Sequence, residues 1–240
     1  PGWEQFGTTW LPLPHALMLP LAARDELWRS GLAGSIPSTI CFVLAAAFLY
    51  AAARRAFGAA PAAAATAVFA LNPNMLYLQS TAMTEPVFMA CLMALVWALA
   101  RFRDTQSLWL AAFGGVAALA GSLTRYEGWF LIPFAALFFL LSAKRARLAA
   151  ALVFGAIACL GPLYWLAHNR YFYSDWFYFY TGPWSARAIQ GDVSYPGLND
   201  WPKALLYFRT AARLCAGAPL FWLGLGGALL ALARRVFWPV

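Results

Sequence analysis

The stretch SLTRYEGWFLIPF, residues 122–134, decides how the chain can fold. A long apolar run ends just before it, Arg125, Tyr126 and Glu127 follow, and a second apolar run begins at once. Two opposite charges therefore stand between two candidate membrane helices with almost no loop. This stretch is either a tight turn with an interfacial ion pair or part of a functional site.

The composition indicates an integral membrane protein. Of 240 residues, 63% are hydrophobic and 11% are charged, whereas soluble domains are about 45–50% apolar and about 25% charged. The net charge of +8 would suggest nucleic acid if basic residues clustered on a soluble surface. Here they stand at the ends of apolar runs, so we expect membrane lipids as partners and no nucleic acid.

Seven apolar segments follow one another along the chain, at residues 35–53, 60–78, 86–101, 107–123, 128–143, 148–166 and 215–233. Several are shorter than the roughly 20 residues that a membrane-spanning helix needs, so their ends must extend into flanking residues. The pattern predicts an all-α polytopic membrane protein with about seven transmembrane helices in one domain, residues 1–240. Because the chain starts at Pro1, we expect a fragment that lacks the first transmembrane helix.

The positions of the basic residues predict which side of the membrane each end of a segment faces. These residues follow the first, third, fifth and seventh segments, as Arg54, Arg55, Arg101, Arg103, Lys144, Arg145, Arg147, Arg234 and Arg235. If every segment spans, these residues share one side, which is cytoplasmic by the positive-inside rule. The opposite side then holds eight of the nine acidic residues. We expect that side to be the periplasmic face of a bacterial inner membrane.

Two longer stretches are expected on the periplasmic side. Residues 1–34 mix tryptophans and leucines with a few charges, which is typical of amphipathic helices lying in the membrane interface. Residues 167–214 are predicted to form an external loop. Part of this loop, YFYSDWFYFYTGPW at residues 171–184, has the composition of an aromatic belt.

Ionisable residues close to a membrane span are functional candidates, because charges are costly in hydrocarbon. Glu85 opens a span in STAMTEPVF, residues 80–88. A helix start explains it equally well: Thr81 or Thr84 could cap the helix, Pro86 suits the first turn, and the dipole favours a carboxylate there.

The turn in the opening stretch is a second candidate. An arginine suits bidentate contact with a phosphate, and Glu127 could orient Arg125 or bind a sugar hydroxyl. Because Arg125 and Glu127 are two residues apart, on a continuing helix they would point to different sides and pair poorly. We therefore expect Arg125 to face the same external cavity as Glu85, with His15 and residues 171–184 as its roof.

Two more places complete the predicted outer face. In TTWLPLPHAL, residues 8–17, the two prolines are expected to keep the chain extended before His15. In LAHNRYFYSDWF, residues 166–177, a span leaves the membrane at His168, Asn169 and Arg170. A structural histidine and a solvated helix end are the alternatives. Together the four places describe a cavity that could accept an anionic lipid headgroup.

The order of these motifs resembles the GT-C glycosyltransferases. The stretches that carry the similarity are WLPLPH (10–15), YAAARRAFG (50–58), ALNPNMLYLQSTAMTEPVF (70–88) and AALAGSLTRYEGWFLIP (117–133). They are similar to the branch that contains protein O-mannosyltransferases and lipid A aminoarabinose transferases.

The resemblance implies transfer of a hexosyl or pentosyl group from a polyprenyl-phosphate carrier to an acceptor hydroxyl on the periplasmic side. It also implies an acidic residue in the first external loop, just after the first membrane helix. Glu4 stands too close to Trp10 to match that residue well. We therefore expect the catalytic carboxylate to lie upstream of Pro1.

Metal binding and competing functions stay open. No His, Cys or Asp cluster has ligand spacing, so we assign no metal site, although carboxylates from separate loops could still converge on a divalent metal. A transporter or flippase would place charged or broken helices near the midplane, and only Asn72-Pro73 breaks a span here. A polyprenyl-linked glycan ligase or polymerase would share the outer-face features, and a non-enzymatic assembly subunit is a further alternative. The acceptor could be a lipid, a glycan or a protein.

Overall fold

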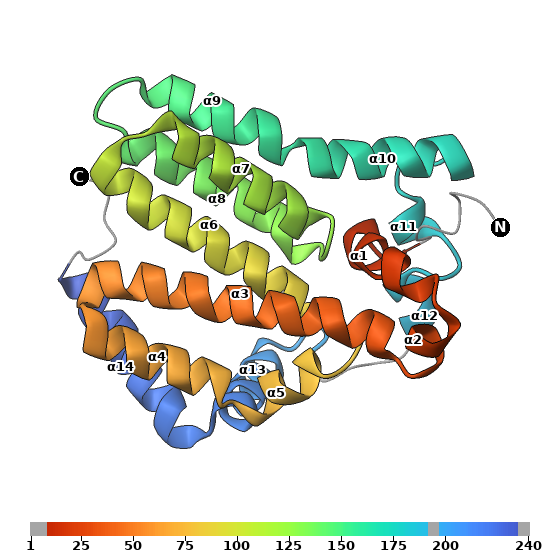
Figure 1. Cartoon of the computed structure of the whole chain (residues 1–240), viewed down its shortest axis with the longest axis horizontal. Coiled ribbons are helices and arrows are strands. Elements are labelled where there is room, and N and C mark those ends of the chain that lie inside the picture. Colours follow the sequence, from red (N-terminus) through yellow and green to blue (C-terminus); the bar gives the residue numbers. More distant parts are fainter. Residues whose placement is uncertain (1–8, 192–196, 235–240) are drawn as a thin grey trace.

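The computed structural model describes residues 9–191 and 197–234, and the elements within these ranges are helices (Figure 1). In chain order they are α1 (Pro12–Ala22), α2 (Asp25–Arg29), α3 (Leu32–Phe57), α4 (Ala59–Ala70), α5 (Pro73–Gln79), α6 (Glu85–Thr105), α7 (Leu108–Ser122), α8 (Glu127–Ser142), α9 (Arg147–Ala158), α10 (Leu160–Tyr173), α11 (Tyr178–Thr181), α12 (Ala186–Gln190), α13 (Trp201–Ala216) and α14 (Ala218–Ala233). The predicted all-α membrane class is confirmed.

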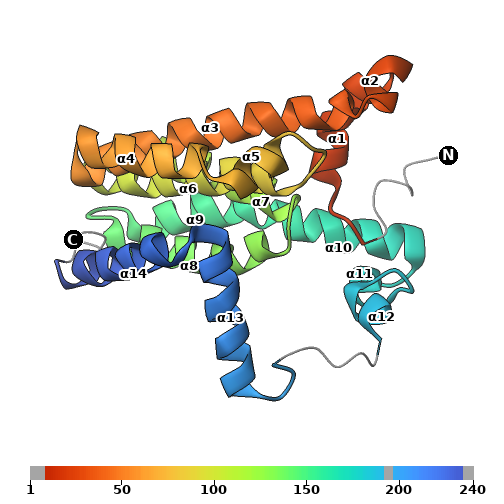
Figure 2. The same cartoon turned by 90° about the horizontal axis from the view of Figure 1, so that it is seen from below.

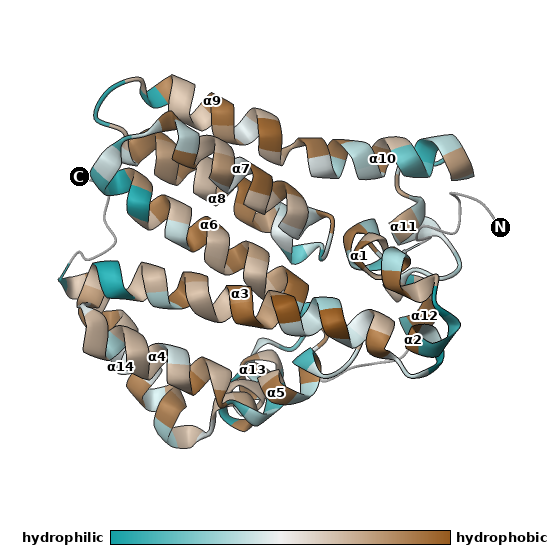
Figure 3. Cartoon of the chain, viewed as in Figure 1, coloured by the Kyte–Doolittle hydropathy of each residue, from teal (hydrophilic) through white to brown (hydrophobic). Residues whose placement is uncertain are grey.

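Three stretches of helix are long and apolar enough to cross a membrane: α3, α6 and the adjoining pair α9–α10. Helices α4, α7 and α8 are apolar but shorter, and the bent pair α13–α14 could make a fourth span. Figure 3 shows apolar residues along these helices and polar residues gathered towards their ends. The predicted count of seven spans is therefore not confirmed for the described residues.

The predicted segment 60–78 is broken into α4 and α5. Pro73 has no N–H group to continue the hydrogen bonds of α4, and the Asn72 side chain caps α5 by accepting from the Asn74 and Met75 N–H groups. The side-chain amides of Asn72 and Asn74 also donate to the Cys215 carbonyl, at 3.1 and 3.2 Å. These bonds hold the end of α13 beside α5.

The N-terminal stretch contains helices as expected, whereas the predicted external loop is more helical than expected. Within the described residues, 1–34 contains α1 and α2 and runs into α3, while 167–214 starts inside α10 and ends inside α13. Residues 1–8, including Glu4, lie outside the described ranges. Figure 2 shows α13 leaving the bundle and α14 turning back along it, after a bend of 108°.

The prolines of residues 8–17 start a helix instead of prolonging an extended segment. Leu11 is extended, with φ −67° and ψ 147°, and Pro12 occupies the first turn of α1, where a missing N–H group costs nothing. Only the first part of the stretch is therefore extended. The Leu13 N–H group donates to the Leu123 carbonyl at 3.0 Å, which fixes α1 over the end of α7.

The core lies where α6, α7, α8 and α9 pack against one another. Phe139 of α8 is fully buried between Phe102 and Phe154, with ring centroids 4.9 and 5.0 Å away. Small residues allow close helix contact, as is common between membrane helices. A Cβ atom on Gly115 of α7 would lie 3.0 Å from the Phe154 carbonyl oxygen of α9.

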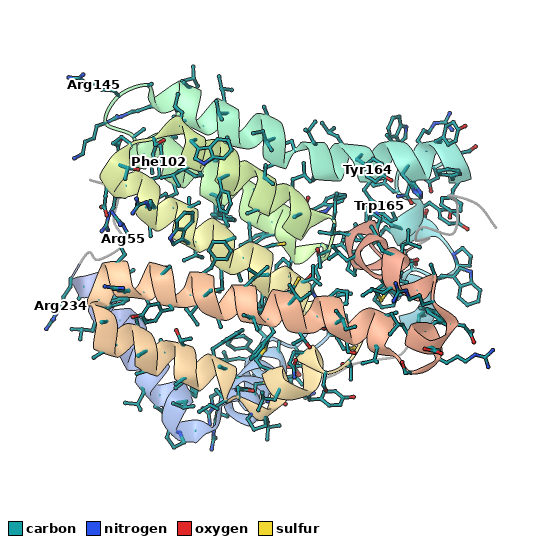
Figure 4. All side chains as sticks on the ribbon, viewed as in Figure 1. Arg55, Phe102, Arg145, Tyr164, Trp165 and Arg234 are labelled. Atoms are coloured by element: carbon teal, nitrogen blue, oxygen red, sulfur yellow. The ribbon has the colours of Figure 1, made fainter. Side chains whose placement is uncertain are left out.

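The two ends of the bundle differ in charge. Figure 4 shows Arg55, Arg145 and Arg234 near one end, where Arg55 pairs with Asp104. Helix α1, the start of α6, the turn between α7 and α8, and α11 and α12 lie towards the other end (Figure 1). The helices therefore alternate in direction as the charge pattern predicts, and the candidate residues gather at the second end.

Candidate functional site

The turn at Arg125 is tight because α8 begins against the end of α7. The Arg125 N–H group donates to the Gly121 carbonyl, and the Gly128 N–H group donates to the Arg125 carbonyl, both at 3.0 Å. A Cβ atom on Gly128 would lie 2.7 Å from the Gly121 carbonyl group. Only glycine allows the backbones of α7 and α8 to lie this close together. In the resulting turn, the Arg125 side chain points towards the start of α6.

Arg125 holds two carboxylates at once. Its Nη1 donates to Glu85 Oε1 at 2.8 Å, and its Nη2 donates to Glu127 Oε1 at 2.8 Å. Nη1 also lies 3.3 Å from the Thr84 hydroxyl oxygen. Arg125 and Glu85 therefore meet, but Glu85 is not among the residues that line the cavity at Arg125, so the expectation of a shared cavity is met only by Arg125.

The prediction that Arg125 and Glu127 would not pair is wrong. It assumed a continuing helix, but α7 ends at Ser122 and α8 begins at Glu127. The turn between them lets the two side chains meet. We refer to Glu85, Arg125 and Glu127 as the charge cluster, and its formal charge is −1.

The contact between Arg125 and Glu127 stabilises the charged form of each side chain. The hydrogen bond from Arg125 holds the pKa of Glu127 below its usual value, and the same contact raises the pKa of Arg125. Glu85 Oε2 is buried and has no hydrogen-bond partner among the described residues. Glu85 is not among the residues that line the cavities described below, so its carboxylate lies behind Arg125.

Glu85 is the first residue of α6, and Pro86 stands in the first turn, as predicted. The expected side-chain cap is absent: Thr84 occupies the capping position but makes no cap bond, and its hydroxyl faces Arg125 instead. The Thr81 hydroxyl donates to carbonyls of the preceding turn. Neither threonine therefore caps α6, and the Thr84 side chain instead lies beside the charge cluster.

Tyr126 is the hub of the neighbouring contacts. Its hydroxyl donates to the Thr9 carbonyl at 2.8 Å and accepts from the Trp165 indole N–H at 3.1 Å. Its ring stacks on Phe179 and meets Trp129 edge-on, with centroids 5.0 and 5.6 Å away. Burial raises the pKa of the phenol, which keeps it protonated and able to donate.

Two adjoining cavities meet at Tyr126. The first, of about 440 Å³, holds the turn and is lined by Thr9, Trp10, Leu11, Thr84, Thr124, Arg125, Tyr126, Glu127, Trp184, Ala186, Ile189 and Gln190. The second, of about 810 Å³, is more aromatic and is lined by Thr9, Tyr126, Trp129, Phe179, Tyr180, Ala186, Arg187, Gln190, Gly191 and Leu198. We call them the charged cavity and the aromatic cavity.

The expected roof is confirmed only in part. Trp184, Phe179 and Tyr180, from residues 171–184, do line these cavities. His15 is not among the lining residues, and its Nδ1 lies 3.3 Å from the carbonyl oxygen of Leu11, which immediately precedes α1. Trp10 and Leu11 contribute the N-terminal wall instead.

His168 and Asn169 lie behind the cavities. His168 stacks on Trp165, with centroids 4.8 Å apart, and the Asn169 amide donates to the Trp165 carbonyl at 2.7 Å. Figure 4 places Trp165 on α10, at the same end as α1. Both residues therefore support the indole that bonds Tyr126. Arg170 is exposed and does not line either cavity.

Several residues of this site were not predicted, notably Thr9, Thr84, Trp129, Trp165 and Gln190. The aromatic ones carry no distinguishing sequence signal, because tryptophan and tyrosine are common at every membrane interface. In the described part of the chain, no group of three or more His, Cys, Asp or Glu residues is placed to hold a metal ion.

Comparison with known proteins gives one match. The family model described as dolichyl-phosphate-mannose-protein mannosyltransferase matches residues 27–165. The matched range contains all three residues of the charge cluster and ends at Trp165. Neither the curated proteins nor the solved structures give a match.

Proposed function

The chain belongs to the dolichyl-phosphate-mannose-protein mannosyltransferase family of GT-C membrane glycosyltransferases, and from this premise we propose that it transfers a sugar at the Arg125 end of the molecule. The family indicates a polyprenyl-phosphate-linked sugar as the donor. We propose the hydroxyl of a lipid, glycan or protein as the acceptor. The proposed location is a bacterial inner membrane, with the charge cluster on the periplasmic face.

The reaction needs two kinds of assistance. The acceptor hydroxyl gives its proton to a base while its oxygen bonds to the anomeric carbon, since a hydroxyl alone is a weak nucleophile. The bond between that carbon and the phosphate oxygen breaks, and its electron pair leaves with the polyprenyl phosphate. A fixed cation stabilises this developing charge. We propose Arg125 as that cation and, as the family resemblance implies, a carboxylate of the first external loop as the base.

The charge cluster is the observation that carries this proposal. It joins the start of α6 to the turn before α8, beside a cavity of about 440 Å³. Glu85 would hold Arg125 in position from behind, because it pairs with Nη1 but does not line the cavity. Tyr126, with His168 and Asn169 behind it, would hold the turn in place, while His15 would act through the packing of α1.

The aromatic cavity is the proposed place for the acceptor. It adjoins the charged cavity at Tyr126, and its walls come from α11, α12 and Trp129 at the start of α8. Cavities with aromatic walls and a few polar groups are typical ligand sites. Arg187 and Gln190 supply the polar groups here. Arg170 remains a candidate for contact with lipid headgroups.

A ligase or polymerase for polyprenyl-linked glycans would use the same outer face, and only the acceptor would differ. A transporter or flippase is less well supported. Transporters place ion and substrate sites near the midplane, whereas the ion pairs described for α3 and α6 lie at the helix ends. The family membership also favours transfer.

The test is sugar transfer by the full-length enzyme with a labelled polyprenyl-phosphate sugar. Arg125→Ala should lower the rate by about 10²–10³-fold, and Arg125→Lys should also lose activity because it lacks the bidentate fork. Arg145→Ala, at the opposite end, is the control and should keep its activity. Normal turnover by a folded Arg125→Ala variant would remove Arg125 from the site.

A further inference from the structure

The charge cluster poses a problem for an anionic donor. One guanidinium and two carboxylates carry a net charge of −1, so an arriving phosphate meets repulsion rather than attraction. All three Arg125 nitrogens already donate hydrogen bonds to Glu85 or Glu127. For Arg125 to bind a phosphate, one carboxylate has to leave it.

We propose that Glu127 is a placeholder: it occupies the phosphate-binding edge of Arg125 in the free protein, and the donor phosphate displaces it. This inference rests on the proposed function, and it assigns a specific role to Glu127. It also explains how a negatively charged cluster can serve an anionic substrate.

The geometry distinguishes the two edges of the guanidinium. The edge formed by Nε and Nη2 holds Glu127, with Nε 3.3 Å from both carboxylate oxygens and Nη2 2.8 Å from Oε1. This edge presents two parallel N–H groups, the arrangement that binds phosphate or carboxylate in bidentate fashion. Glu85 contacts only Nη1, so the two carboxylates do not compete for the same edge.

Burial indicates which carboxylate leaves. The Glu127 side chain is 59% exposed, whereas that of Glu85 is 29% exposed. Exposed ion pairs contribute little to stability, so water can readily take the place of Arg125 around Glu127. Glu85 is half-buried at the start of α6 and would keep Arg125 oriented during the exchange.

The exchange changes the charge that the phosphate meets. Once Glu127 turns towards water, Arg125 and Glu85 form a neutral pair with the bidentate edge open. When the phosphate leaves after transfer, Glu127 can return to that edge. The same carboxylate would then assist release of the polyprenyl phosphate product.

Binding of sugar-free polyprenyl phosphate to the full-length protein tests the inference. Glu127→Gln should bind about 2- to 5-fold more tightly than the unchanged protein, as expected for removing a competing exposed ion pair. The gain should shrink at high salt, where exposed charges are screened. Glu127→Ala is a second variant that opens the same edge, and it should tighten binding in the same direction.

Glu85→Gln is the matched control, because it removes the same charge from the opposite edge. It leaves Glu127 in place and should give no comparable gain. Equal tightening by Glu85→Gln and Glu127→Gln would show a general charge effect and overturn the placeholder role, as would unchanged or weaker binding by both Glu127 variants. Failure of the proposed function looks different: Arg125→Ala would then bind polyprenyl phosphate as well as the unchanged protein.

Discussion

Tyr126 joins three segments of the chain through one hydroxyl group. It links the N-terminal stretch at Thr9, the turn before α8 and the fully buried Trp165 of α10. Replacing it with Phe keeps the ring but leaves the Trp165 indole N–H without its acceptor. A buried donor that loses its partner costs about 1–3 kcal/mol. We expect Tyr126→Phe to lower the melting temperature in detergent.

Tyr171→Phe is the control for this substitution. Tyr171 lies on the same helix as Trp165 but is 81% exposed, so loss of its hydroxyl should leave the melting temperature nearly unchanged. If the two variants melt alike, the Tyr126 hydroxyl does not hold these segments together.

Contacts between single residues could be predicted from the sequence only where they follow from the order and direction of the helices. Glu85 and Arg125 could be paired in advance because both begin or end helices on the same side. The contact between Arg125 and Glu127 could not, because it depends on where α7 ends. Likewise, no pattern in TTWLPLPHAL indicates that His15 lies in α1 while Thr9 and Trp10 line the cavities.

At the scale of helices, the site depends on the close contact of α7 and α8. A Cβ atom on Gly128 would lie 2.7 Å from the Gly121 carbonyl carbon and oxygen and 2.8 Å from the Ser122 nitrogen. These are backbone atoms and cannot turn aside as a side chain could. We expect Gly128→Ala to destabilise the protein by about 1–3 kcal/mol, as overpacking commonly does, and to weaken binding of polyprenyl phosphate by shifting Arg125.

Gly155→Ala provides a matched comparison within the same bundle. Beyond its own turn of helix, no atom of the described residues lies within 4 Å of a Cβ atom built on Gly155, and alanine favours a helix over glycine by about 1 kcal/mol. This variant should melt at the same or a higher temperature and bind polyprenyl phosphate normally. Equal melting temperatures for the two variants would mean that the α7–α8 contact relaxes without cost.

The number of spans could not be predicted from hydropathy because breaks within apolar runs are made by single residues. Pro73 and the capping side chain of Asn72 divide the second predicted segment into α4 and α5. In the opposite sense, α9 and α10 together run on to Tyr173, past the predicted end at residue 166. Composition therefore identified the class and the core helices, but not their lengths.

At the scale of the whole molecule, the distribution of charge leads to a prediction about orientation. Basic residues gather at the end that holds Arg55 and Arg145 (Figure 4), and such residues remain cytoplasmic. Helices α11 and α12 and the charge cluster lie at the other end, so we expect them outside. Ala188 and Ala146 are both exposed and mark the two ends. In a variant without the four native cysteines, Ala188→Cys should react with an impermeant maleimide in intact cells, whereas Ala146→Cys should react only after permeabilisation. The reverse pattern would place the charge cluster in the cytoplasm and contradict transfer on the periplasmic face.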